Sequence, residues 1–179
     1  NAEANYYLAE AYKSRKQYTT ALRYYKEAIN SNPEYISAYI HYGDTLSLLR
    51  NYEEAIAQYK KALGLDPGNS TIKNKLAEAY YNFGNIEKAK QTYNEILSES
   101  SENFTALKGL GTLNKEEGNY EDAVKYFDDA LNVRNDKQVQ IVLGNSYLKM
   151  DQLDDAKQEF NSVLTRDPYN SEAYLGLGK

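Results

Sequence analysis

The stretches RNYEEAIAQYKKA (residues 50–62) and GNYEDAVKYFDDA (residues 118–130) share one pattern. In each, an alanine is followed four residues later by an aromatic residue and seven residues later by a second alanine. The first alanine and its aromatic recur at steps of 33 or 34 residues, as Ala21 with Tyr25, Ala55 with Tyr59, Ala89 with Tyr93, Ala123 with Phe127 and Ala156 with Phe160. A fixed period of this length predicts an array of repeated supersecondary units.

A second set of small residues lies twelve residues before those alanines: Ala9, Gly43, Ala77, Gly111 and Gly144. Each follows a large apolar residue, namely Leu8, Tyr42, Leu76, Leu110 and Leu143. Apolar residues recur at spacings of three and four around both sets of small residues, which is typical of amphipathic helices. We therefore expect two helices per repeat, with the small residue of the first facing the alanine of the second and the aromatic filling the space beside them.

Turn and boundary residues agree with this period. The predicted turns within the repeats are Lys16-Gln17, Arg50-Asn51, Gly84-Asn85, Gly118-Asn119 and Asp151-Gln152, where Gly or Asn can accept a left-handed backbone. The predicted N-caps of the first helices are Asn1, Asn69, Asn103, Asp136 and Asn170, and Pro33, Pro67 and Pro168 follow the ends of second helices. The turns are short, so the paired helices should be antiparallel.

These residues define repeats at 2–35, 36–69, 70–103, 104–136 and 137–170, with the start of a sixth at 171–179, and we predict that they form a single domain. The chain resembles the tetratricopeptide repeat (TPR) family through its small residue in the first helix, its alanine and aromatic in the second, and its closing proline. It departs from the motif where Trp is common, at Asn5, Tyr39, Lys73, Leu107 and Gln140. The resemblance implies an all-α fold, a right-handed α-solenoid of helix-turn-helix units.

Composition excludes several classes of function. The 179 residues carry 26 acidic and 21 basic side chains without a dense basic cluster, which argues against nucleic acid as a partner. Since no apolar run approaches the roughly 18 residues of a membrane-spanning helix, we expect no membrane insertion and a soluble chain. Its compartment stays open, with the cytoplasm slightly favoured. There is no Cys, and His41 is the single histidine, so we expect no metal site, no cofactor and no enzyme activity.

The family resemblance implies that the first helix of each repeat lines a groove for a segment of another protein. The residues mapped to this groove are Glu3, Tyr6, Glu10, Lys13, Ser37, Ile40, Asp44, Ser47, Thr71, Asn74, Glu78, Tyr81, Thr105, Lys108, Thr112, Lys115, Gln138, Ile141, Asn145 and Leu148. Glu10, Asp44 and Glu78 occupy equivalent places, which predicts a preference for basic ligands in the N-terminal half; the alternative is ordinary solvated charge. The same row argues against the carboxylate-clamp subclass, which holds acidic chaperone tails.

Three functions stay open. The first is a scaffold that binds a peptide segment or a helix of a partner protein. The second is a structural module that self-associates, since residues 171–178 (SEAYLGLG) begin a sixth repeat without a capping helix. The third is the substrate-recruiting arm of a larger enzyme.

Overall fold

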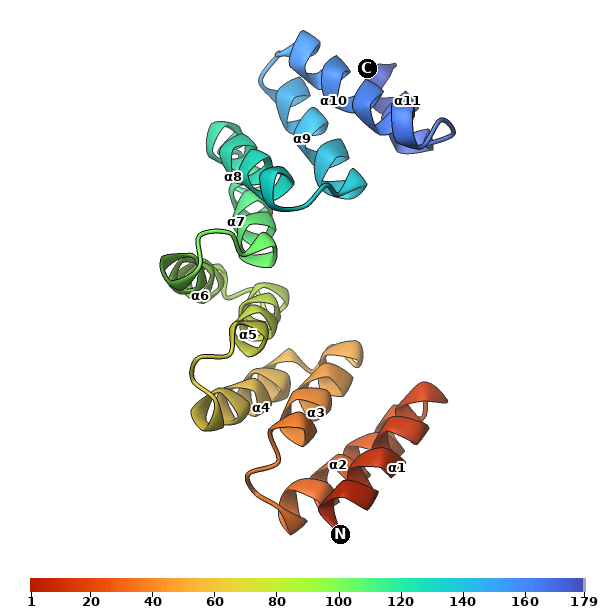
Figure 1. The fold of residues 1–179 in the computed structure, drawn as a ribbon, viewed down its shortest axis with the longest axis vertical. Helices are drawn as coiled ribbons and strands as arrows, with labels where there is room; N and C mark the ends of the chain where they lie inside the picture. Colours follow the sequence, from red (N-terminus) through yellow and green to blue (C-terminus); the bar gives the residue numbers. More distant parts are fainter. Residues whose placement is uncertain (179) are drawn as a thin grey trace. The chain divides into compact units, whose positions relative to one another are not determined.

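The computed structural model describes residues 1–178, and within them it contains helices and no strands (Figure 1). The helices are α1 (Ala2–Ser14), α2 (Tyr18–Ser31), α3 (Ile36–Leu48), α4 (Tyr52–Leu65), α5 (Ser70–Asn82), α6 (Ile86–Glu99), α7 (Phe104–Glu116), α8 (Tyr120–Val133), α9 (Lys137–Lys149), α10 (Leu153–Arg166) and α11 (Ser171–Leu177). The predicted all-α fold is confirmed. None of these helices is both long enough and apolar enough to cross a bilayer.

The helices form two compact units, Asn1–Thr92 and Tyr93–Lys179, which we call the N-terminal unit and the C-terminal unit. In the N-terminal unit, α1 packs on α2, α2 on α3, α3 on α4 and α4 on α5. In the C-terminal unit the same order runs from α7 to α11, and α11 also contacts α9. Each helix therefore packs mainly on its neighbours in the sequence, as in a repeat protein. The repeat boundaries and the single domain given above stay predictions.

The core of each unit consists of the alanines and aromatics of the repeat pattern. Ala9, Ala21 and Tyr25 form one buried cluster in the N-terminal unit. In the C-terminal unit, Phe127 and Phe160 are at most 1% exposed and each lies in a cluster with the pattern alanines of its helix. Burying such a ring stabilises the fold by roughly 1.5–3 kcal/mol relative to leaving it exposed.

The glycines of the first helices lie against the aromatic rings of the second helices, and the predicted contact between the small residues and the second-helix alanines stays a prediction. The atoms nearest to a Cβ built at Gly43 are ring carbons of Tyr59, the closest at 2.6 Å. At Gly144 the nearest atoms belong to the ring of Phe160, the closest at 2.8 Å. At these two positions the ring occupies the space that a Cβ would need, so glycine lets the two helices approach closely.

The predicted N-caps of α1, α5, α7, α9 and α11 are confirmed, since each side-chain oxygen accepts a backbone N–H of the first turn. The turns differ in part from the prediction. The left-handed residues are Gly84 and Gly118, as expected, but elsewhere they are Lys16, Arg50 and Asp151, with φ values of 59° to 60°. The expected role for asparagine was wrong, because Asn51 and Asn119 have negative φ and begin the next helix.

One face of α1 is exposed although the same register is buried in later helices. Leu8 is 44% exposed and Tyr7 60%, whereas Leu76 and Leu110 are at most 6% exposed. The reason is that α3, α5 and α9 each lie against the second helix of the repeat before them, whereas among the described residues no helix precedes α1.

Candidate protein-binding site

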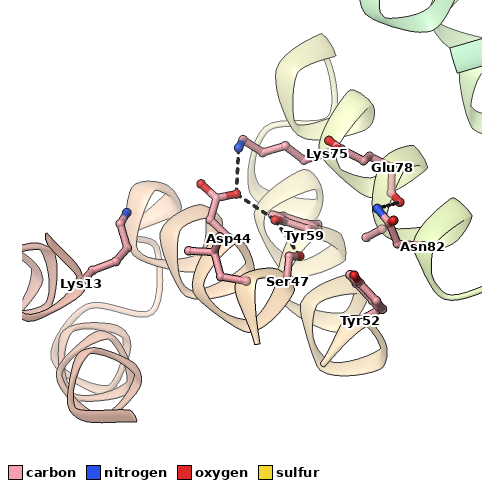
Figure 2. A pocket seen from close by; sticks show the side chains of 10 residues that line it. Lys13, Asp44, Ser47, Tyr52, Tyr59, Lys75, Glu78 and Asn82 are labelled. Atoms are coloured by element: carbon pink, nitrogen blue, oxygen red, sulfur yellow. Dashed lines mark hydrogen bonds and ion pairs between the residues drawn. The ribbon is translucent and has the colours of Figure 1, made fainter. Parts of the chain in front are cut away.

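An open pocket of about 440 Å³ in the N-terminal unit is formed by α1, α3, α4 and α5. We call it the N-terminal pocket, and its lining residues are Lys13, Asp44, Ser47, Leu48, Tyr52, Tyr59, Lys75, Glu78, Ala79 and Asn82. Figure 2 shows Asp44, Tyr59 and Lys75 pointing toward one another from three separate helices. Amphipathic helices bring them together, because the stripe that faces away from the core of each first helix lies on the same side of the unit.

Asp44 organises the polar part of this pocket. Its Oδ1 accepts hydrogen bonds from the Tyr59 hydroxyl and from the Lys75 Nζ, both at 2.8 Å (Figure 2). Burial raises the pKa of Tyr59, and the neighbouring Asp44 carboxylate raises it further. The Ser47 hydroxyl lies 3.4 Å from the same tyrosine oxygen. Tyr59 thus stays a neutral donor, and the charge of Asp44 is offset by Lys75.

Two residues of the pocket remain open to a ligand. Leu48 is 59% exposed, a large apolar side chain in contact with water. Glu78 is exposed, and its carboxylate makes no hydrogen bond or ion pair with any residue that the structure describes. The pocket therefore offers a ligand the apolar side chain of Leu48 and the unpaired carboxylate of Glu78. Both lie beside Asp44, whose charge is offset by Lys75.

Glu10 is engaged in a cluster of its own. Its Oε1 accepts from the Tyr25 hydroxyl, from Lys13 Nζ at 3.0 Å and from His41 Nδ1 at 2.7 Å. Burial acts to raise the pKa of Glu10, but the hydrogen bonds from Tyr25, His41 and Lys13 together hold it below its usual value. Burial and the nearby Glu10 raise the pKa of Tyr6 to about 12. In this arrangement the imidazole Nδ1 carries the proton that it donates to Glu10.

The predicted acidic row is thus reduced to one open charge. Glu10 is satisfied by three donors and Asp44 by Lys75 and Tyr59, so only Glu78 presents an unpaired carboxylate. The preference for a basic ligand stays a prediction, and within the N-terminal unit it rests on Glu78.

The C-terminal unit contains two further pockets that share α9. The first, of about 400 Å³, we call the lysine pocket, and its lining residues are Lys115, Tyr120, Val142, Asn145 and Lys149. The second, of about 360 Å³, we call the apolar pocket, and its lining residues are Leu148, Leu153, Ala156, Lys157, Phe160, Asn161, Gly176 and Leu177.

All three pockets occupy the same place in the repeat. Ser47, Lys115 and Leu148 are equivalent positions near the end of a first helix, separated by whole repeats of 34, 34 and 33 residues. Tyr52, Tyr120 and Leu153 are equivalent first residues of the following second helix. The fold therefore repeats one pocket geometry, and the sequence gives each copy a different chemistry: mixed charge, basic and apolar.

The predicted groove residues divide between these pockets and other places. Lys13, Asp44, Ser47 and Glu78 line the N-terminal pocket, while Lys115 and Asn145 line the lysine pocket. Tyr6, Ile40, Asn74, Tyr81, Lys108 and Thr112 lie on the same first helices and line none of the three pockets. Tyr6 packs against Tyr35 and His41 instead. Ile141 was wrongly placed in the groove, because it is 4% exposed and packs in the core with Phe160.

The sequence reasoning missed several pocket residues. Asn82 and Lys149 stand four residues after Glu78 and Asn145, one further turn along the same helix face. Tyr52 and Tyr120 come from the second helix, and the predicted set contained first-helix residues only. Widening each predicted stripe by one residue, past Tyr81 and Leu148, would have found the first pair.

Family models match most of the chain. The model described as "Cytochrome c-type biogenesis protein H TPR domain" matches residues 16–141, and a "Tetratricopeptide repeat" model matches residues 114–179. Among curated proteins, the TPR repeat-containing protein MJ1428 of Methanocaldococcus jannaschii is 29% identical over 182 residues, covering 94% of this chain and 31% of that protein. The protein CTR9 homolog of Arabidopsis thaliana is 32% identical over 97 residues, covering 53% of this chain and 9% of that protein. The chain spans less than a third of the length of either relative.

Solved structures share the fold at low sequence identity. A tetratricopeptide repeat protein from Parabacteroides merdae superposes with a TM-score of 0.84 at 23% identity, covering 98% of this chain and 70% of that chain. A crystal structure of the MamA protein gives a TM-score of 0.80 at 16% identity, covering 93% of this chain and 92% of that chain. YrrB, described as a TPR protein with an unusual peptide-binding site, gives a TM-score of 0.74 at 17% identity, covering 100% of this chain and 93% of that chain. With repeat-pattern residues forming the core of both units and a family model matching residues 16–141, this chain belongs to the tetratricopeptide repeat family.

Proposed function

We propose that this chain is a non-catalytic scaffold that binds a segment of a partner protein on the first-helix face of its repeats. The observation that carries the proposal is the recurrence of one pocket, at one place in the repeat, with three different linings. Residues that serve only the fold keep the same character from repeat to repeat, as the buried Ala21, Ala89 and Ala123 do. Variation at an open pocket is what recognition of one particular ligand requires.

The composition of the N-terminal pocket supports a protein ligand. Exposed Leu48 and the Tyr52 ring can bury an apolar side chain, and Glu78 with Lys13 can select a polar neighbour. The pocket is open to solvent and extends over three first helices, which suits an extended or helical peptide. Its polar floor is held by the Asp44 hydrogen bonds, so a ligand would meet a preformed surface.

Neighbouring leucines provide a matched test. Leu48 and Leu49 are 59% and 45% exposed, but only Leu48 lines the pocket. Random twelve-residue peptides displayed on phage would be selected on the immobilised protein, and the affinities of the retained peptides measured by fluorescence polarisation. Leu48→Ser should weaken binding by about three- to tenfold, since one apolar anchor is lost, and Leu49→Ser should leave it unchanged.

Two results would count against the scaffold. One is the failure of the wild-type protein to retain any peptide above the background of a denatured sample. The other is an equal effect of Leu48→Ser and Leu49→Ser on every retained peptide, which would place the binding surface elsewhere.

A second candidate is self-association, favoured by the exposed face of α1. Ala4, Tyr7, Leu8 and Ala11 form an exposed stripe at helical spacing, and its equivalents in α5 and α7 are buried in large part. A second copy of the chain could cover this stripe. Light scattering over a concentration series should then show dimers that Leu8→Glu abolishes, and a monomer at all concentrations would remove this candidate.

A further inference from the structure

The lysine pocket is lined by two cations and by no anion. Lys115 extends from α7 and Lys149 from α9, and the remaining lining residues are Tyr120, Val142 and Asn145. Neither lysine makes a hydrogen bond or an ion pair with any residue in the described part of the chain. Two unpaired ammonium groups at one pocket repel each other, and a bound carboxylate would relieve that repulsion.

Comparison with the N-terminal pocket shows that the charge is inverted at equivalent positions. Asp44 and Glu78 correspond to Thr112 and Asn145, so both carboxylates are replaced by neutral side chains. In the opposite sense, the neutral Ser47 and Asn82 correspond to Lys115 and Lys149.

The lysine that pairs with Asp44 in the N-terminal pocket has no counterpart in the lysine pocket. Lys75, which pairs with Asp44 at 2.8 Å, corresponds to Val142. Four of the five exchanges make the pocket more positive, and together the five change it from mixed charge with an open carboxylate to purely basic.

The apolar pocket adds a second requirement. It follows the lysine pocket along the C-terminal unit, and residues of α9 line both pockets. Leu148 lines the apolar pocket, whereas Val142, Asn145 and Lys149 line the lysine pocket. Leu153 is 59% exposed there and Leu177 is 37% exposed. A segment lying across α9 would therefore meet ammonium groups first and an apolar surface next.

We propose that the C-terminal unit binds an acidic peptide segment, with a carboxylate between Lys115 and Lys149 and a neighbouring apolar side chain in the apolar pocket. This inference rests on the proposed scaffold function and names the chemistry of its partner. The chain as a whole has a net charge of −5, so its long-range field does not attract an acidic ligand. Selection must come from contacts within the pocket, where opposite charge gives specificity and the apolar contact gives affinity.

The test selects peptides from a random library on three forms of the intact chain. These are the wild type, the pocket variant Lys115→Glu/Lys149→Glu, and a control variant with the same change in net charge, Lys26→Glu/Lys125→Glu. Lys26 and Lys125 are exposed residues of α2 and α8 that line none of the three pockets. Peptides retained by each form are sequenced, and wild-type peptides are then titrated against all three. Circular dichroism confirms that the variants melt as the wild type does.

We expect wild-type selections enriched in Asp or Glu next to Leu, Ile or Phe. Such peptides should bind the pocket variant roughly tenfold or more weakly and the control within about twofold, with the difference shrinking as salt is raised. This inference would be overturned, and the scaffold function left intact, if the retained peptides were not enriched in acidic residues. The same holds if peptides selected on the pocket variant were as acidic as those selected on the wild type. Retention of no peptide at all would overturn both.

Discussion

The ring of Phe127 lies so close to Gly111 that a Cβ at position 111 would stand 2.6 Å from its Cε1 atom. Phe127 is 1% exposed and packs with Ala123 and Ala130, so the ring has no free space into which it can move. This contact is the crossing point of α7 and α8.

Gly111→Ala should therefore destabilise the protein. Alanine favours a helix over glycine by about 1 kcal/mol, but overpacking at this crossing costs about 2–3 kcal/mol because the ring is fully buried, and we expect a net loss of about 1–2 kcal/mol in the free energy of unfolding. Gly64→Ala in α4 is the matched control, because nothing lies within 4 Å of its added Cβ. Urea denaturation should show that Gly64→Ala is neutral or stabilising; equal losses in both variants would contradict the packing described here.

The turns offer a second test of backbone geometry. Arg50 has a φ of 60°, where a residue with a side chain is strained, and Arg50→Gly should raise the free energy of unfolding by about 0.5–1 kcal/mol. The reverse change, Gly118→Ala, should cost about 1 kcal/mol, since position 118 has a φ of 82° and open space around it. Thermal melts of both variants check the opposite signs, and a shift in the same direction would argue that strain does not decide these turns.

A third prediction concerns the N-caps. Asn69 Oδ1 accepts the backbone N–H of Ile72 at 3.1 Å, whereas Asn51 precedes α4 without a side-chain cap. Asn69→Ala should cost about 1 kcal/mol and Asn51→Ala close to nothing, because only the first leaves a helix N–H without its acceptor. Chemical denaturation of the two variants distinguishes them, and a larger loss for Asn51→Ala would be inconsistent with the capping found here.

The Glu10 cluster predicts a dependence on pH. Three donors hold the pKa of Glu10 below 4.5 in the folded state despite partial burial. A lowered folded pKa stabilises the protein above the unfolded pKa, and this contribution is lost as pH falls through the folded value. Glu10→Gln should thus cost about 1–2 kcal/mol at pH 7, through the lost charged acceptor, and progressively less below pH 4.5.

Urea denaturation of wild type and Glu10→Gln at several pH values between 7 and 3 measures the difference. Glu27→Gln is the control, since Glu27 is exposed on α2 and makes no ion pair in the described residues. A Glu10→Gln penalty that stays constant as the pH falls would show that the cluster does not depend on the charge of Glu10.

The helices and the residues of the core were predictable from the sequence because their signals are local and recur with the repeat. Ala123 and Phe127 can be recognised from Ala55 and Tyr59, and an N-cap such as Asn69 acts within its own first turn. Periodicity did not identify the contact of Gly111 with the Phe127 ring, because spacing along a helix does not say which atom of the facing helix lies opposite.

The charge state of the candidate site was decided by tertiary structure alone. Asp44 and Lys75 are 31 residues apart, as are Glu10 and His41, and each pair meets only when the first helices of neighbouring repeats lie side by side. As a pattern, Glu10, Asp44 and Glu78 are three equivalent carboxylates, but packing supplies donors to two of them and leaves Glu78 open. The repeat period determines which positions face outward, but only the neighbouring helix determines which of the charges at those positions are neutralised. The reason is that Coulomb and hydrogen-bond energies depend on distances between atoms, which the linear order of residues does not contain.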